Sequence, residues 1–290
     1  MPARAGMNRS LAAPHQRNWD LRAAGNFVFG GTGAGLIMTA AAAAVSGAPF
    51  RLALAIGLVS VMIGLSLVWL EIGKPWRALN VFFHPRTSWM TRESIVAGAL
   101  IPAGLVAVAL ASPIAAVAAT PLACGFLFCQ ARILHAARGI PAWRQKELVP
   151  FILATGLAEG SGLYLLAGAG SFPWLALALF AGLLREAAWL AYRAGLARTP
   201  GAARSRAIFD TQAGRLAQHA QLAALVLIAL ALALTGFPAV SLPLAAAGGA
   251  LAALAGWVLK ALLITRAAFT RAAAVPVIPV RGSGGGPVRR

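Results

Sequence analysis

Charged residues are scarce in this sequence, and acidic residues are the scarcest of them. Only 11% of the 290 residues are charged, and the seven acidic residues are outnumbered by 25 basic ones. A soluble globular domain carries about 25% charged residues, so this chain has too few to cover a surface that faces water. The composition therefore excludes a soluble catalytic domain and indicates that a lipid bilayer solvates the chain.

Cysteine and histidine are also rare, which limits the redox centres that the chain can hold. Its two cysteines, Cys124 and Cys129, lie five residues apart in one apolar segment and face different directions on a helix. A four-thiolate iron–sulfur cluster is excluded. Among four histidines, only His135 and His219 lie near helix ends on one side, which leaves a single b-type haem as an alternative. We expect no bound metal.

Apolar runs make up most of the remaining sequence, with 60% hydrophobic residues and a mean hydropathy of +0.78. A bilayer-spanning helix needs about 20 apolar residues. Eight stretches qualify: 26–46, 51–72, 93–111, 113–136, 148–169, 172–193, 216–236 and 241–264. We predict an all-α integral membrane protein whose eight transmembrane helices form a bundle over residues 26–266. The flanking tails are 1–25, with no cleaved signal peptide, and 267–290, which we expect to be disordered.

The basic residues are distributed asymmetrically along this pattern. On one side of the predicted bundle lie both tails, every second connection and the helix ends next to them. These segments hold 24 of the 25 basic residues, and only Arg51 falls on the other side. Seven of the eight tryptophans follow the same asymmetry. The positive-inside rule places the basic side in the cytoplasm, and an even number of helices places both termini there. We predict a multi-pass protein of the bacterial inner (plasma) membrane, with lipid and not nucleic acid as the partner of its net charge of +18.

Two acidic residues fall inside predicted helices. Glu159 lies eleven residues into the fifth helix, roughly 16 Å deep, and Glu186 lies about two turns from the inner end of the sixth, next to Arg185. An intramembrane carboxylate is costly and is a functional hypothesis by default. We assign both to proton transfer. The alternatives are an ion pair with Arg185 or a backbone hydrogen bond for Glu159, and pairing with a nearby arginine for Glu186.

The connection between the second and third helices, EIGKPWRALNVFFHPRTSWMTRE, is the densest polar and aromatic stretch. Its spacing resembles the membrane anchor subunit of dimethyl sulfoxide reductase and, more distantly, the polysulfide- and nitrite-reductase anchors. The matching residues are Gly73, Pro75, Arg77, Asn80, Ser88 and Glu93, joined in the next basic connection by Arg132, Pro141 and Trp143. Eight helices also match, so the resemblance covers nearly the whole chain. The segment QARILHAARGIPAWR is most similar to anchors of phenylacetyl-CoA:acceptor oxidoreductases.

The resemblance implies a quinol/quinone site at this end of the bundle, with menaquinone or ubiquinone as an exchangeable substrate. It also implies a docked four-cluster iron–sulfur subunit, a molybdopterin catalytic subunit beyond it, and no haem. The chain would then be a non-catalytic subunit of an oxidoreductase complex. Because the basic face is predicted to be cytoplasmic, the complex would act on a cytoplasmic substrate such as a coenzyme A thioester.

Quinone chemistry needs hydrogen-bond partners for the ring and a proton acceptor, and desolvation helps a carboxylate to exchange protons. The resemblance implies that Glu93 is the functional glutamate, whereas Glu71 stands where the family has a histidine, which leaves the proton partner open. We assign the quinone site to Glu71, Trp76, Arg77, His84, Glu93 and Asn26, and partner docking to Arg132, Pro141 and Trp143. The alternatives are a secondary transporter with Glu159 as its coupling site, a b-type cytochrome subunit, and a passive anchor.

Overall fold

The computed structural model describes residues 14–16, 18–71 and 75–270, without the side chains of 71 and 75–78. Within these residues it confirms an all-α bundle with eight helices that are long and apolar enough to cross a membrane. The first span joins α1 (Leu21–Gly25), the π-helical η1 (Asn26–Gly30) and α2 (Gly31–Val45). The others are α3 (Arg51–Glu71), α4 (Trp89–Ala109), α5 (Pro113–Ala136), α6 (Leu148–Leu166), α7 (Phe172–Arg198), α9 (Gln212–Ala233) and α10 (Pro238–Thr265). Two short helices, η2 (Pro75–Phe83) and α8 (Ala203–Phe209), lie in connections.

Several spans begin earlier than the apolar runs predict, because polar residues extend them at the membrane surface. The first span starts at Leu21, where the Asp20 carboxylate accepts a hydrogen bond of 2.7 Å from the Arg22 backbone N–H. Helix α4 starts at Trp89 because Ser88 caps it by accepting from the Thr91 N–H at 3.3 Å. Such caps satisfy backbone donors that have no partner within the helix. A hydropathy window stops short of these polar turns.

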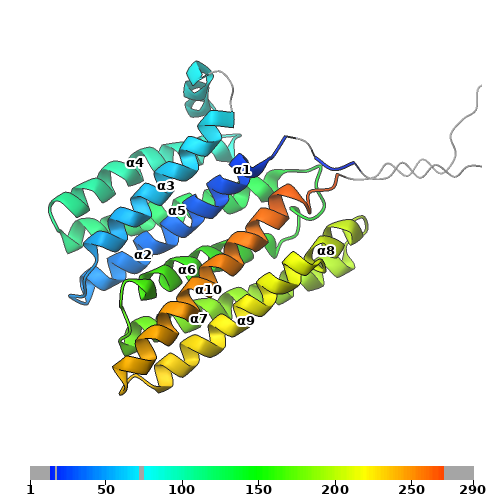
Figure 1. Ribbon diagram of the computed structural model, residues 1–290. Coiled ribbons are helices and arrows are strands. Elements are labelled where there is room, and N and C mark those ends of the chain that lie inside the picture. Colours follow the sequence, from blue (N-terminus) through cyan, green and yellow to red (C-terminus); the bar gives the residue numbers. More distant parts are fainter. Residues whose placement is uncertain (1–13, 17, 72–74, 271–290) are drawn as a thin grey trace, which may run out of the picture.

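The eight spans run up and down, so the bundle has two different ends (Figure 1). We call the end that holds residues 14–16, 18–20 and 266–270 the proximal end, together with the connection between α3 and α4, described from residue 75 to 88, and connections 137–147 and 199–211. The distal end carries the shorter connections 46–50, 110–112, 167–171 and 234–237. At the proximal end the two tails pair, since the Gln16 N–H donates to Ala268 O at 3.0 Å and the Thr270 N–H to Pro14 O at 2.9 Å.

Glycines let the central helices approach closely. Helix α2 packs against α3, α5 and α6, and α10 packs against α6 and α9. A Cβ at Gly35 or Gly160 would run into the backbone across the α2–α6 interface, and one at Gly249 would run into Gly162 between α6 and α10. Small residues at such contacts are typical of membrane bundles, where van der Waals packing drives association. This packing brings η1, α6 and α10 together in the proximal half.

Candidate functional site

Two buried polar side chains meet across the first span and α4. Glu93 lies one turn into α4 and is 4% exposed, and Asn26, the first residue of η1, is 3% exposed. The Asn26 Nδ2 amide donates to Glu93 Oε1 at 3.3 Å, across 67 residues of sequence. On the α3 side, a Cβ at Gly64 would lie 3.1 Å from Asn26 Oδ1, so glycine leaves the space that Asn26 uses. The structure therefore brings together two of the predicted quinone-site residues.

A cavity of about 270 Å³ opens beside this pair. Asn26 and Glu93 are its polar lining, and the apolar and aromatic lining consists of Trp19, Ala23, Phe27, Val68, Met90 and Ile133. Small-molecule sites are about 300–1,000 Å³ and combine an apolar wall with a few polar groups. This cavity lies just below that range, so its size suits one flat ring system better than a whole dinucleotide or haem.

Trp19, which the sequence interpretation did not select, forms part of the cavity wall. Its ring lies 4.9 Å from the Trp143 ring and 5.9 Å from the Phe27 ring, centroid to centroid. The Gln16 side chain fixes the backbone here, because its Oε1 accepts from the Trp19 N–H at 2.7 Å and its Nε2 donates to Trp19 O at 2.7 Å. The paired tails therefore shape the cavity, a role that hydropathy and charge counts do not reveal.

A basic and aromatic cluster lies on the helices next to the cavity. The guanidinium groups of Arg92 and Arg132 lie 4.1 Å and 4.9 Å from the Trp89 ring centroid, and Phe128 packs edge-on against the same ring. Arg92 also donates from Nε to Pro85 O at 2.8 Å, which ties the end of the 72–88 connection to α4. Arg132 is half-buried in this cluster, so part of it is available to a partner.

The other residues predicted for quinone binding and docking have different surroundings. Glu71, Trp76 and Arg77 are among the residues whose side chains lie outside the description, and His84 is exposed and does not line the cavity. Pro141 and Trp143 are buried, and the Trp143 indole donates to Leu263 O at 3.1 Å. A buried side chain has no surface to offer a partner. Pro141 and Trp143 therefore support the proximal connection, and their role in docking stays a prediction.

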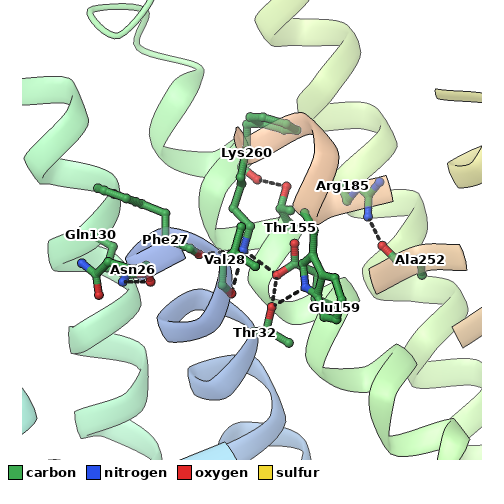
Figure 2. A network of polar contacts seen from close by, with 12 residues as sticks. Asn26, Phe27, Val28, Thr32, Gln130, Thr155, Glu159, Arg185, Ala252 and Lys260 are labelled. Atoms are coloured by element: carbon green, nitrogen blue, oxygen red, sulfur yellow. Dashed lines mark hydrogen bonds and ion pairs between the residues drawn. The ribbon is translucent and has the colours of Figure 1, made fainter. Parts of the chain in front are cut away.

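Deeper in the proximal half, Glu159 forms an ion pair with Lys260 at 2.6 Å, with both side chains at most 1% exposed (Figure 2). The Thr32 hydroxyl donates to the same Glu159 oxygen, Oε2, at 2.7 Å, and the Trp257 indole donates to Thr32 at 2.9 Å. The sequence alternative of a Glu159–Arg185 ion pair is wrong, since Arg185 Nη1 donates to Ala252 O at 2.6 Å.

Lys260 links this ion pair to the π-helical turn. Its Nζ donates to Phe27 O at 2.8 Å and to Val28 O at 3.4 Å, and Gln130 Nε2 donates to Asn26 O at 3.0 Å. π-helical turns are rare and occur frequently at functional sites. The segment Asn26–Gly30 therefore contacts the cavity on one side and the Glu159–Lys260 pair on the other.

The remaining candidates lie apart from this network. Glu186 is half-buried on α7 and accepts a 2.7 Å hydrogen bond from Gln218 on α9. His135 is on α5, whereas His219 is exposed on α9, which packs against α7 and α10. The two histidines therefore do not face each other as axial ligands would. Within the described part of the chain, no three His, Cys, Asp or Glu residues are grouped as a metal site.

The fold and the cavity together define a multi-pass α-helical membrane protein with a mixed polar and apolar site near one end of its bundle. Neither the comparison with protein-family models nor the comparison with curated proteins finds a match to this chain. The resemblance to the reductase anchors therefore stays a prediction that rests on the residues quoted above.

Proposed function

We propose that this chain is the membrane anchor and quinone-reactive subunit of a molybdopterin and iron–sulfur oxidoreductase. It passes electrons between the quinone pool and a docked iron–sulfur subunit, and the catalytic chemistry takes place in the partner subunits. One observation carries the proposal: Glu93, a buried carboxylate with an amide partner, faces an apolar cavity at the proximal end of the bundle.

The cavity supplies what a quinol needs. A quinol that is oxidised loses two electrons and two protons, and the electrons go to an iron–sulfur cluster of the docked subunit. Phe27, Trp19 and Met90 surround the ring with apolar and aromatic surface. The Asn26 amide can donate to a quinone oxygen, and the Glu93 carboxylate accepts one of the two protons. Positioned proton acceptors contribute about 10²–10⁴-fold to a rate, so Glu93 is the residue with the largest expected effect.

The basic face provides the orientation and the partner side of the proposal. Lys260 and Arg185 were counted with the basic surface but are buried in the bundle. Without these two, the described basic residues lie at or near the proximal end, apart from Arg51, which lies at the distal end. The positive-inside rule then places the proximal end in the cytoplasm of a bacterial cell. The partner subunits dock there and act on a cytoplasmic substrate, for which a coenzyme A thioester is the candidate.

Substitution of Glu93 tests the proposal. Glu93→Gln keeps the size of the side chain and its hydrogen bond to Asn26 but cannot accept the proton. In the complex purified through this chain, we expect quinol-linked turnover to fall about 10²–10⁴-fold, while activity with a soluble artificial donor or acceptor is retained. The matched control is Glu186→Gln, because Glu186 is also a carboxylate with an amide partner but lies on α7, facing α9. The control should bind a short-chain quinone with unchanged affinity.

Other outcomes distinguish the alternatives. Unchanged quinol-linked turnover in Glu93→Gln, with the complex intact, would mean that the chain is a passive anchor. Loss of both activities would mean that Glu93 holds subunits together. A Soret band in the purified chain would indicate the b-type cytochrome, although His135 and His219 lie on helices that do not bring them face to face.

A secondary transporter is the second candidate, and one observation favours it. The first span changes from α-helical to π-helical at η1, beside a buried carboxylate, and many transporters build their ion sites from irregular parts of helices. In this chain, however, the Lys260 ammonium already occupies the Phe27 and Val28 carbonyls that a transported cation would use. Transport would be shown by solute-driven counterflow in proteoliposomes that contain this chain and no quinone.

A further inference from the structure

A row of buried polar side chains leads from the cavity into the middle of the bundle. Its members come from six helical segments and are each at most 3% exposed: Asn26, Thr32, Gln130, Glu159, Arg185 and Lys260. In Figure 2, Asn26 and Gln130 lie on one side of Lys260 and Glu159, and Arg185 lies on the other. Glu93 contacts the near end of this row through Asn26. The quinone site as proposed uses only that near end.

Three atoms along the row are buried and have no hydrogen-bond partner among the described residues, namely Gln130 Oε1, Glu159 Oε1 and Arg185 Nη2, and Asn26 Oδ1 is likewise unpartnered at the near end, on the α3 side. Buried polar atoms almost always have a protein or water partner, and a buried water makes about three hydrogen bonds. At Gly31 an added Cβ would lie 3.0 Å from Lys260 Nζ and 3.4 Å from Gln130 Oε1, so both atoms face the same small space. The row therefore has the polar atoms that would hold a chain of internal waters.

We propose that the Glu159–Lys260 pair is a proton-loading site that exchanges a proton with Glu93 along this row. The inference deepens the proposed function and rests on it, because quinol in the cavity is the source of the proton. The transfer converts a protonated Glu93 and an ionised Glu159 into an ionised Glu93 and a protonated Glu159. Lys260 remains an ammonium, and each water accepts one proton and passes on another, so charge is conserved.

The geometry around Glu159 suits this exchange. Oε2 accepts from both Thr32 and Lys260, whereas Oε1 has no described donor and lies against Gly256, where a Cβ would collide with it. A proton can therefore be added on Oε1 while both bonds to Oε2 are kept. The charged side chains that face Glu159 are Lys260 from α10 and Arg185 from α7, and α2 contributes Thr32.

Lys260 keeps its stabilising contacts when Glu159 is neutral. The loss of one charge from a buried ion pair is costly because it leaves the other charge uncompensated. Here the carbonyl oxygens of Phe27 and Val28 also accept hydrogen bonds from the ammonium group. The π-helical turn therefore provides a second set of acceptors, which limits the cost of loading the site.

The test uses the complex purified through this chain, in nanodiscs, with a short-chain quinol as the reductant. Glu159→Gln should leave the affinity for the quinone unchanged and lower quinol-linked turnover on the order of tenfold, less than the 10²–10⁴-fold of a direct proton acceptor. Infrared difference spectra of quinol oxidation should show the C=O band of a protonated carboxylic acid in the unmodified complex, and Glu159→Gln should lack it. The matched control is Thr155→Val, one turn away on α6, because the Thr155 hydroxyl donates at 2.6 Å to Phe151 O of its own helix.

The outcomes separate this inference from the proposed function. Unchanged turnover and an unchanged infrared band in Glu159→Gln overturn proton loading and leave the quinone site intact. Failure of the unmodified complex to bind the quinone or oxidise the quinol overturns both. If Glu159→Gln does not assemble, Gly256→Ala replaces it, since the added Cβ would collide with Oε1 and force the Glu159 carboxylate to shift, with Gly98→Ala in open space as its control. Loss of assembly in both variants would make the pair structural and overturn the proposal.

Discussion

The proximal and distal halves of the bundle are built from the same Ala-, Gly- and Leu-rich helices but use their interiors differently. Among the described residues, the four buried charged side chains are Glu93, Glu159, Arg185 and Lys260, and they lie in the proximal half or at its inner boundary. The buried polar side chains of the distal half include Thr39 and Ser161, whose hydroxyls bond back to carbonyls of their own helices. The hydrogen bonds of these two hydroxyls therefore stay within one helix and do not link it to another.

The distal half is held together without buried charges, whereas the proximal half contains them. Apolar packing and close glycine contacts join the distal halves of the helices, together with hydrogen bonds to backbone carbonyls from Tyr164 and Arg51. Buried charges are costly in a membrane and are weak evidence for stability even when they are paired. Their restriction to one half, next to a cavity, therefore argues for function. A larger distal hollow of about 640 Å³ lies between connections 46–50 and 167–171, but Arg51 is the one charged residue in its lining.

The largest expected contrast between the two ends is the compartment that each of them faces. A reporter fusion at Arg204, in the proximal connection, should show cytoplasmic activity, and a fusion at Gly170, in a distal connection, should show periplasmic activity. The excess of basic residues at the proximal end is the physical reason. The reverse pattern would overturn the orientation and, with it, the inference of a cytoplasmic substrate, but it would leave the cavity unchanged.

Next in size is the stability effect of breaking the buried ion pair. Lys260→Met leaves Glu159 buried without its cation, which should cost about 3–5 kcal/mol of unfolding free energy. The double variant Lys260→Met, Glu159→Gln should recover most of this loss, because no uncompensated charge remains. Unfolding titrations in detergent measure both. A loss below about 1 kcal/mol for Lys260→Met would mean that the pair is hydrated and open rather than enclosed.

The sequence predicts the eight spans well, since apolar runs of bilayer length are a strong signal. It also selected Glu159, because a carboxylate is rare inside such a run, while the resemblance selected Glu93, and Asn26 was a candidate from its place at the start of the first helix. What it could not predict was their contacts, since Asn26 and Glu93 meet across 67 residues.

Lys260 shows the limit most clearly. A lysine side chain about one turn from the end of an apolar run can extend to the membrane surface or point into the bundle. The hydropathy of the run does not distinguish these two orientations. The signal that was available is that GWVLKALLIT places one lysine inside an apolar stretch, while Glu159 stands alone in another. Two lone opposite charges at intramembrane depth favour a pair. No pattern in the sequence indicates that Trp19 lines the cavity, because its position depends on the pairing of residues 14–16 with 268–270.

A smaller effect is expected from a glycine contact toward the distal half. Gly249→Ala adds a Cβ that collides with the backbone of Gly162 between α10 and α6. Backbone shifts of this kind cost about 1–3 kcal/mol. Gly98→Ala, where nothing lies within 4 Å, should change the unfolding free energy by no more than about 0.5 kcal/mol. Detergent unfolding compares the two, and equal values would mean that the α6–α10 contact relaxes freely.

The smallest effect concerns the polar turn at which the first span enters the membrane. Asp20 caps α1, and Arg22, which donates to the Asp20 carboxylate at 2.8 Å and 3.0 Å, also donates to Leu70 O at 3.2 Å. These contacts join the start of the first span to the end of α3 beside the cavity. The side-chain hydrogen bonds from Arg22, followed by the backbone N–H, hold the pKa of Asp20 below its ordinary value of 3.8.

Because the folded pKa of Asp20 is lowered, its contribution is fully present above the ordinary value of 3.8 and is lost as the pH falls through the folded pKa. Asp20→Asn should therefore speed hydrogen exchange in peptides that cover residues 19–26 at near-neutral pH. The difference from the unmodified chain should shrink on the acid side of 3.8, where protonation removes the same charge. Hydrogen-exchange mass spectrometry over this range measures it, with Asp210→Asn as the control, since Asp210 pairs with Arg193 far from the first span. A difference that persists at the acid end would mean that the carboxylate acts through its shape and not through its charge.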